Sequence, residues 1–183
     1  DTIAHLFQVK QPDAKIIVAG CMVQKHNELL KSHFPNIHYM LGSGDVEKIL
    51  DAVQSEQTGA AVTSAKSYLE WGEIPRMIST PKHYAYLKIA EGCKKRCAFC
   101  IIPKLRGNVR SRTIASLVEE AKAMAADGVR ELNLVAQDLT EYGMEWKYRE
   151  NLEMLLPELC KIEGIEWIRL HYAFPSGFPE DVL

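Results

Sequence analysis

Strands and helices alternate along the second half of the chain, and this alternation limits the folds that the chain can adopt. Repeated strand–helix units give parallel strands that are joined by right-handed crossovers. The pattern predicts an α/β domain over residues 84–183, either the start of a (β/α) barrel or an open doubly wound sheet. The segments that carry the pattern are YAYLKIA, VRELNLVAQD and IEWIRLHYAF as strands, with TIASLVEEAKAMAADG and LEMLLPELCKIEG as helices, the second weakened or broken by Pro157.

Residues 1–65 predict a separate, smaller α/β domain. The β-branched run KIIVAG is typical of a buried strand, and IHYMLGSG reads as a second strand leading into a glycine-rich turn. Asp45 stands where an N-cap is wanted for the helix predicted over VEKILDAVQ. Further helices are predicted over TIAHLFQVKQ and HNELLKSHF. The stretch that follows has scattered Gly, Pro, Ser and Thr with no firm period, so residues 66–83 are predicted to be a linker.

Composition sets the broad class of protein. The chain has 183 residues and a net charge of −2, so bulk charge does not indicate nucleic acid or a membrane surface. It has no apolar run of about 18 residues and no signal peptide. Five cysteines are too few for a disulfide scaffold, and we expect a cytoplasmic protein that does not contact membranes. Because the chain starts at Asp1 and lacks a closing element after Leu183, we expect a fragment of a longer protein.

Three of the five cysteines fall within one short loop directly after a predicted strand. Cys93, Cys97 and Cys100 have the spacing Cys-x3-Cys-x2-Cys. Three thiols leave one unpaired in any disulfide connectivity. Structural zinc takes four ligands, and the candidates for a fourth, such as His83 and His171, lie outside the loop. A zinc site therefore stays open as an alternative with weak support.

Three thiolates also suit a cubic iron–sulfur cluster that keeps one iron unoccupied by protein. A conventional 4Fe-4S electron-transfer site has four cysteine ligands, and this loop offers three. Catalytic metal sites keep a coordination position open, whereas structural sites close it. The missing fourth cysteine then leaves room for a small molecule that has an amine and a carboxylate.

This loop, placed after the first strand of a βα repeat, resembles that of the radical S-adenosylmethionine enzymes. The resemblance implies a 4Fe-4S cluster on Cys93, Cys97 and Cys100, with S-adenosylmethionine bound to the open iron. It further implies that one electron from the cluster breaks a C–S bond and that the resulting 5′-deoxyadenosyl radical abstracts hydrogen from carbon. Phe99 occupies the family's aromatic position near the adenine; its alternative role is core packing.

The residues around the loop resemble the methylthiotransferase branch of these enzymes. That branch carries a second 4Fe-4S cluster on three cysteines of a preceding α/β domain, which presents the sulfur. The context KIIVAGCMVQKH matches the last of these ligands and assigns Cys21, whose two partner cysteines would lie upstream of Asp1. From composition alone, Cys21 is a small buried hydrophobe. The matching residues after the loop are Ile101, Ile102, Pro103, Arg106, Gly107, Ser111 and Arg112.

Two further segments resemble the member of the branch that methylthiolates an aspartate β-carbon in the twelfth small-subunit ribosomal protein. These are VAQDLTEYG and IEWIRLHYAFPSGFPEDVL. The tRNA-modifying members tend to carry Gln-Asn where this chain has Gln137-Asp138, and Ser-His-Pro where it has YAFP. The resemblance implies a ribosomal protein substrate, a flavodoxin- or ferredoxin-like electron donor and a monomeric enzyme. A tRNA adenosine methylthiotransferase and a non-catalytic iron–sulfur or zinc module remain the alternatives.

Gln137 and Asp138 follow the second strand of the repeat, at the edge where α/β folds bind ligands. They are candidate cofactor-binding residues, with helix capping as the alternative. The arginines at 106, 110 and 112 are expected in a solvated loop, although an acidic partner would also suit them. Simple structural roles are expected of the remaining residues considered: Cys160 in a helix core, His171 within a strand, and Tyr172 and Phe174 in packing.

Overall fold

The computed structural model describes residues 1–63, 77–147, 149–175 and 178. The chain divides into two compact units. The first comprises residues 1–68 together with Lys104–Gly107, and the second comprises the remainder. Most of the predicted linker, residues 66–83, lies outside the described residues, which resume at Met77.

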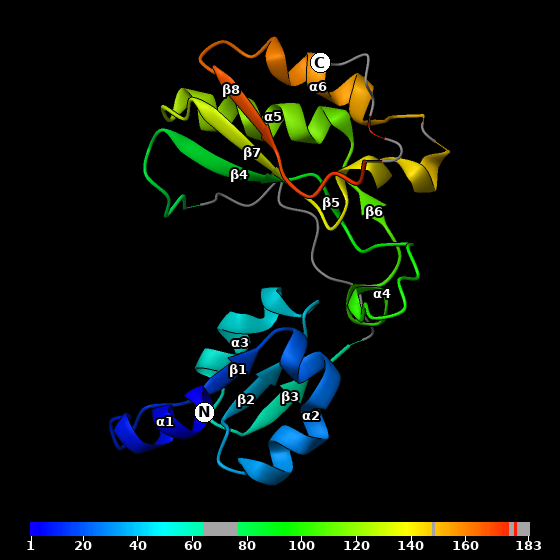
Figure 1. Ribbon diagram of the computed structural model, residues 1–183. Helices are drawn as coiled ribbons and strands as arrows, with labels where there is room; N and C mark the ends of the chain where they lie inside the picture. Colours follow the sequence, from blue (N-terminus) through cyan, green and yellow to red (C-terminus); the bar gives the residue numbers. More distant parts are fainter. Residues whose placement is uncertain (64–76, 148, 176–177, 179–183) are drawn as a thin grey trace. The chain divides into compact units, whose positions relative to one another are not determined.

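The first unit is built on a three-stranded parallel sheet with the order β1-β2-β3 (Figure 1). Its strands are β1 Ile17–Ala19, β2 Tyr39–Leu41 and β3 Gly59–Ala61. Its helices are α1 Thr2–Val9, α2 Cys21–His33, the 3-10 turn η1 Val46–Lys48 and α3 Ile49–Gln54. The sequence did not predict β3, because a short Gly-Ala-Ala strand has neither the length nor the β-branched residues of a strand pattern.

Asp45 precedes η1 as predicted, but its side chain does not cap the helix. It is 2% exposed, and its carboxylate accepts hydrogen bonds from the backbone N–H and the hydroxyl of Thr63, at 3.1 and 2.9 Å. Lys48 Nζ lies 3.3 Å from the same carboxylate. Asp45 therefore ties the turn after β2 to the chain that leaves β3.

The second unit is built on a parallel sheet with the order β4-β7-β8. Its strands are β4 Tyr84–Lys88, β7 Glu131–Val135 and β8 Trp167–Leu170, and a separate antiparallel pair joins β5 Ala90–Glu91 to β6 Arg110–Ser111. The predicted strand YAYLKIA is thus divided between two sheets. Its helices and 3-10 turns are α5 Ile114–Ala126, η2 Leu139–Glu141, η3 Met144–Trp146 and α6 Leu152–Cys160. Helix α4, Ile102–Arg106, lies between β5 and β6 in the sequence, and its residues from Lys104 onward belong to the first unit.

Both long helices of this unit, α5 and α6, cover one face of the β4-β7-β8 sheet (Figure 1). Side chains of all three strands pack there against the buried leucines of the helices. Each new strand is added beside the previous one, without the reversal in strand order that defines a doubly wound sheet. Of the two predicted architectures, the described strands therefore have the arrangement of the start of a barrel.

Several local predictions for this unit are wrong. Helix α6 runs through Pro157, because buried Leu155, Leu156 and Leu159 hold it on the core on both sides of the proline. Cys160 is exposed rather than buried in the core. Strand β8 ends at Leu170, so His171 lies beyond it. None of the helices in the described ranges is long and apolar enough to span a membrane.

Asp45 gives the first unit a specific dependence on pH. Burial opposes its ionisation, but the hydrogen bonds from Thr63 and the nearby Lys48 outweigh that cost and hold the pKa of Asp45 below its ordinary value of 3.8. A carboxyl whose pKa is lower in the folded state stabilises the fold above pH 3.8, and that contribution is lost as the pH falls through the folded pKa. We predict that Asp45→Asn destabilises this unit at pH 6 by about 1–3 kcal/mol and removes this acid sensitivity.

Hydrogen exchange of the Gly42 N–H, which donates to Ala61 O at 2.8 Å, measures the effect within the same unit. The exposed Asp51 provides the control, because Asp51→Asn is the same chemical change on the surface of α3. Equal acid sensitivity of exchange in the Asp45→Asn and unsubstituted proteins would contradict the prediction.

Candidate cofactor site at the carboxyl edge of the second sheet

The cysteine loop begins at the carboxyl edge of the second sheet. The backbone N–H of Ile89, just after β4, donates to Val135 O at the end of β7, and β5 follows directly. The loop then runs from Gly92 until β6, which pairs antiparallel with β5 and so brings the two ends of the loop together. The three predicted ligands are therefore presented from the edge of the sheet where α/β folds bind ligands.

The three thiols of the loop differ in exposure. Cys93 is buried at 9% exposure, Cys100 is half-buried and Cys97 is exposed, and all three are free thiols. Within the described ranges, no three His, Cys, Asp or Glu side chains are gathered closely enough to hold a metal ion. The donor set nevertheless fits a cluster with three thiolate ligands, since three free thiols lie within eight residues of irregular chain.

Gln137 lies just after β7 and bonds directly to the start of the loop. Its amide oxygen accepts from the backbone N–H of Gly92 at 2.6 Å, and its amide nitrogen donates to the Glu91 carboxylate at 2.7 Å. Both ends of the predicted cofactor-binding side chain therefore contact protein. The cofactor role of Gln137 stays a prediction.

Asp138 contacts the loop and also caps η2, the alternative role that the sequence left open. It is 7% exposed, and its carboxylate accepts from the Thr140 N–H and hydroxyl at 3.0 and 2.7 Å while pairing with Lys95. Burial opposes its ionisation, but the hydrogen bonds from Lys95 and Thr140 prevail and lower the pKa of Asp138 from its ordinary value. Lys95 also lies over the Phe174 ring, 3.7 Å from its centre.

Glu141 is a further residue of the site, and the sequence did not predict it. It is 3% exposed, and its carboxylate accepts from the backbone N–H of Lys94 at 3.1 Å. Burial raises the pKa of the Cys93 thiol, and the neighbouring Glu141 and Asp138 carboxylates raise it further. The available signal was a second acidic residue three positions after Asp138, but nothing in the pattern distinguished it from a solvent-exposed glutamate.

Two further predicted site residues are Phe99 in the loop and Cys21 in the first unit. Phe99 is 94% exposed, which excludes core packing and leaves its predicted place near an adenine untested. In the first unit, half-buried Cys21 is the first residue of α2 and follows Gly20, whose φ of 108° suits glycine. It therefore stands between the carboxyl end of β1 and a helix N-terminus, not within a strand.

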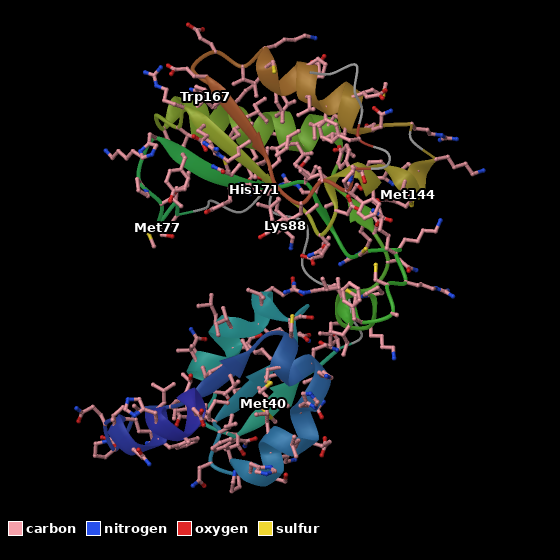
Figure 2. The ribbon with its side chains drawn as sticks, viewed as in Figure 1. Met40, Met77, Lys88, Met144, Trp167 and His171 are labelled. Atoms are coloured by element: carbon pink, nitrogen blue, oxygen red, sulfur yellow. The ribbon has the colours of Figure 1, made fainter. Side chains whose placement is uncertain are left out.

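A cavity of about 510 Å³ opens beside the carboxyl ends of β4 and β7. Figure 2 labels two residues of its lining, Lys88 at the end of β4 and His171 just after β8. His171 Nε2 lies 3.1 Å from Asn133 Oδ1, and Tyr172, expected to pack, is 73% exposed. The lining residues are Tyr86, Lys88, Arg112, Glu120, Val135, His171 and Tyr172.

Arg112 forms part of the wall of this cavity and is not the solvated loop residue that the sequence suggested. It is 5% exposed, pairs with Glu120, and donates to the Ser116 hydroxyl at 2.9 Å and to Lys88 O at 3.3 Å. The hydroxyl of Tyr142 donates to Arg112 O at 2.6 Å. Arg112 thus fixes the chain between β6 and α5 against the end of β4.

Comparison with known proteins identifies the family. The model of the radical SAM superfamily matches residues 87–183, which include the end of β4, the cysteine loop and strands β7 and β8. This chain belongs to the radical SAM superfamily. Membership confirms the α/β fold class and the family resemblance drawn from the loop.

Curated relatives resemble the chain along its whole length. The ribosomal protein uS12 methylthiotransferase RimO of Chlamydia caviae is 49% identical over 100% of this chain, and that of Chlamydia abortus is 51% identical over 100% of it. RimO of Anaeromyxobacter sp. (strain Fw109-5) is 47% identical over 98% of this chain. The chain spans 40% of the length of the first two relatives and 39% of the third.

A solved structure supports the fold. The radical S-adenosylmethionine methyltransferase TsrM from Kitasatospora setae, solved with cobalamin and a [4Fe-4S] cluster bound, matches with a TM-score of 0.57. The match covers 99% of this chain and 41% of TsrM at 16% identity, so it shows a shared fold and nothing of the substrate.

The unequal exposure of the loop thiols has a chemical consequence that can be measured. Thiolate is the reactive form of cysteine, and burial raises the pKa of the Cys93 thiol. We predict that iodoacetamide at pH 8 modifies Cys97 of the metal-free protein at least about tenfold faster than Cys93. Quenched samples that are digested and analysed by mass spectrometry give both rates. Unfolding in denaturant serves as the control and should make the rates similar; equal rates in the folded protein would contradict the prediction.

Proposed function

We propose that this chain is part of a radical SAM enzyme that transfers a methylthio group to the β-carbon of an aspartate in ribosomal protein uS12. The observation that carries the proposal is the similarity of both units to RimO, at 49% identity over the whole chain for one relative. The three-cysteine loop at the sheet edge agrees with it. Segments of both units are thus similar to one relative, as expected of a single enzyme.

Cys93, Cys97 and Cys100 would hold a 4Fe-4S cluster, and Phe99, Gln137 and Asp138 are the proposed contacts for S-adenosylmethionine. When bound, the cluster supplies the electron that splits S-adenosylmethionine to yield a hydrogen abstractor strong enough for an unactivated C–H. The residues of this chain hold the cysteine loop in position. The half-buried start of the loop is fixed against the β7–η2 segment, while the exposed Phe99 is available for a ring contact.

In this proposal, Cys21 would be one of three cysteine ligands of a second 4Fe-4S cluster. Its place at the N-terminus of α2 suits a thiolate, because the N-terminal end of a helix favours negative charge. The division into residues 1–65, a linker over 66–83 and a core over 84–183 belongs to the same proposal. So do a flavodoxin- or ferredoxin-like electron donor, a monomeric enzyme and a cytoplasmic location.

A tRNA adenosine methylthiotransferase is the second candidate function, and a non-catalytic metal module is the third. The tRNA-modifying function is disfavoured by Gln137-Asp138 and the YAFP segment, and by the relatives, which are RimO proteins. The third is disfavoured by membership of a superfamily of S-adenosylmethionine enzymes. The two enzyme candidates make different products and the metal module makes none, so the assays below separate them.

The ligand assignment predicts the loss of one cluster when the central thiol is removed. We expect full-length Cys97→Ala protein, reconstituted anaerobically, to lose about four irons per chain and all cleavage of S-adenosylmethionine. Iron analysis and chromatography of 5′-deoxyadenosine measure the two losses. Cys160→Ala is the matched control, because it removes an exposed thiol of α6 outside the loop. Formation of 5′-deoxyadenosine by the Cys97→Ala protein would contradict the assignment.

The substrate assignment predicts a mass change in one macromolecule. Full-length enzyme with reductant and S-adenosylmethionine should add about 46 mass units to uS12, the difference between SCH3 and H. Mass spectrometry of the intact ribosomal protein and of digested tRNA, taken from the same reaction, measures both candidates together. Modification of tRNA adenosine with unchanged uS12 would contradict the proposal in favour of the second candidate.

A further inference from the structure

Three side chains from one short segment contact the first half of the cysteine loop. Over residues 137–141, the Gln137 amide oxygen accepts from Gly92 N at 2.6 Å and the Glu141 carboxylate accepts from Lys94 N at 3.1 Å. Between them, the Asp138 carboxylate pairs with the Lys95 ammonium. Three of the four residues from Gly92 to Lys95 are therefore bound directly, and the fourth is the cysteine between them.

The two carboxylates of this segment are nearly inaccessible to water. Asp138 is 7% exposed and Glu141 is 3% exposed. A buried charge costs several kcal/mol unless it is paired or hydrogen-bonded. The Lys95 ammonium and the Lys94 N–H supply those partners, so moving residues 94 and 95 away would leave two buried charges short of donors. This free-energy cost favours the conformation in which residues 94 and 95 stay bound to the two carboxylates.

Residues after β8 support the same contact. The Leu139 N–H donates to Tyr172 O at 3.1 Å, and the Phe174 ring lies beneath the Lys95 ammonium, 3.7 Å from ring centre to nitrogen. The Phe174 N–H is 3.4 Å from the Asp138 carboxylate. Lys95 is thus held by a carboxylate and by an aromatic ring from two different segments.

The second half of the loop differs from the first. Cys97 is exposed and Phe99 is 94% exposed, whereas Cys93 is 9% exposed. In this half, the Cys100 N–H donates a local backbone hydrogen bond to Cys97 O at 3.0 Å. One thiol is thus fixed to the sheet edge, while the other two lie on chain that is bound less closely to the rest of the unit.

We propose that Gln137, Asp138 and Glu141 form a clamp that presets Cys93 as the first ligand of the cluster. Cys97 and Cys100 then close around the cluster when it binds. The three clamp residues are positioning residues, because they act through the backbone and Lys95 and not on the reacting atoms. The inference rests on the proposed function for the identity of the bound group, but the clamp itself is a property of the metal-free chain.

If Cys93 is already fixed in the metal-free chain, fewer loop residues must become ordered when the metal binds. Fixing each additional residue costs conformational entropy, so a loop that is already held at one end loses less on binding. Gln137 and Glu141 accept from backbone N–H groups of the loop, and Asp138 pairs with the Lys95 side chain. Outer partners of this kind commonly change metal retention by about tenfold or more when removed.

Substitution of Glu141 tests the clamp in full-length protein that also carries Cys21→Ala, so that only the loop cluster is counted. Glu141→Ala removes the acceptor of Lys94 N–H, and Glu141→Gln keeps an acceptor oxygen. Glu150→Ala is the matched control, since it removes a carboxylate that accepts from Ile114 N at 2.6 Å, away from the loop. Lys95→Met removes the ion pair with Asp138, and Lys95 is itself half-exposed. This variant is used if Glu141→Ala does not fold.

Two readouts are compared: amide exchange of Gly92 and Lys94 in metal-free protein, and the iron retained after a fixed challenge with a chelator. We expect Glu141→Ala to speed exchange at Lys94 by about tenfold and to lower iron retention by a similar factor. Glu141→Gln should stay near the unsubstituted protein, Lys95→Met should shift both readouts in the direction of Glu141→Ala, and Glu150→Ala should leave exchange at Lys94 unchanged.

Unchanged exchange at Lys94 in both the Glu141→Ala and Lys95→Met proteins would overturn the clamp. An equal effect of Glu150→Ala would also overturn it, because the change would then reflect general loss of stability. Failure of the proposed function has a different signature: the exchange of Lys94 responds as expected, but the unsubstituted protein retains zinc and no iron.

Discussion

The parallel pairing of β4 with β7 is the constraint on which the rest of the second unit depends. The two strands pair over five residues, from Tyr84 opposite Glu131 to Lys88 opposite Val135. Because they are parallel and in register, the chain that leaves β4 and the chain that leaves β7 emerge at the same edge. The first becomes the cysteine loop, and the second carries Gln137, Asp138 and Glu141. A change of register would separate the start of the loop from Gln137, Asp138 and Glu141, which now contact it.

This arrangement explains why buried charge occurs at a sheet edge that also bears three free thiols. Two buried carboxylates contact the start of the loop, and each has a hydrogen-bond donor. Glu141 accepts from Lys94 N–H, and Asp138 accepts from Lys95 and from the Thr140 hydroxyl of η2. Such a network is costly if any member is missing, so it favours one conformation of residues 92–95 over others. The remainder of the loop keeps the freedom to gather Cys97 and Cys100 on a bound group.

The sequence predicted the strands and helices of the second unit because their apolar spacing reflects burial against one sheet face. Leu132 and Leu134 alternate along β7 with Glu131, Asn133 and Val135, and both leucines are fully buried in the core. The same reasoning placed Gln137 and Asp138 at the functional edge. It did not assign their contacts, because hydrogen bonds to Gly92 and Lys95 join residues more than 40 positions apart, and no local pattern encodes them. Glu141 was missed for the same reason.

Other residues were misplaced because exposure depends on which partner covers a helix or turn. Cys160 has an apolar setting in the sequence, yet it lies on the outer face of α6, while Leu159 beside it is fully buried. Arg112 was expected in solvent and is instead buried by Glu120 and Ser116 from the helix that follows. Strand β3 escaped notice because its pairing with β2 stabilises three small residues that carry little propensity of their own.

The central claim is that three loop thiols hold a cluster with one iron left open for S-adenosylmethionine. Electron–nuclear double resonance of the reduced full-length protein, carried out with S-adenosylmethionine labelled with ¹⁵N in its amino group and ¹⁷O in its carboxylate, tests this claim directly. We predict hyperfine coupling from both labels to the cluster in the unsubstituted protein. Absence of coupling from either label, with a fourth protein side chain bound to the cluster, would contradict the claim.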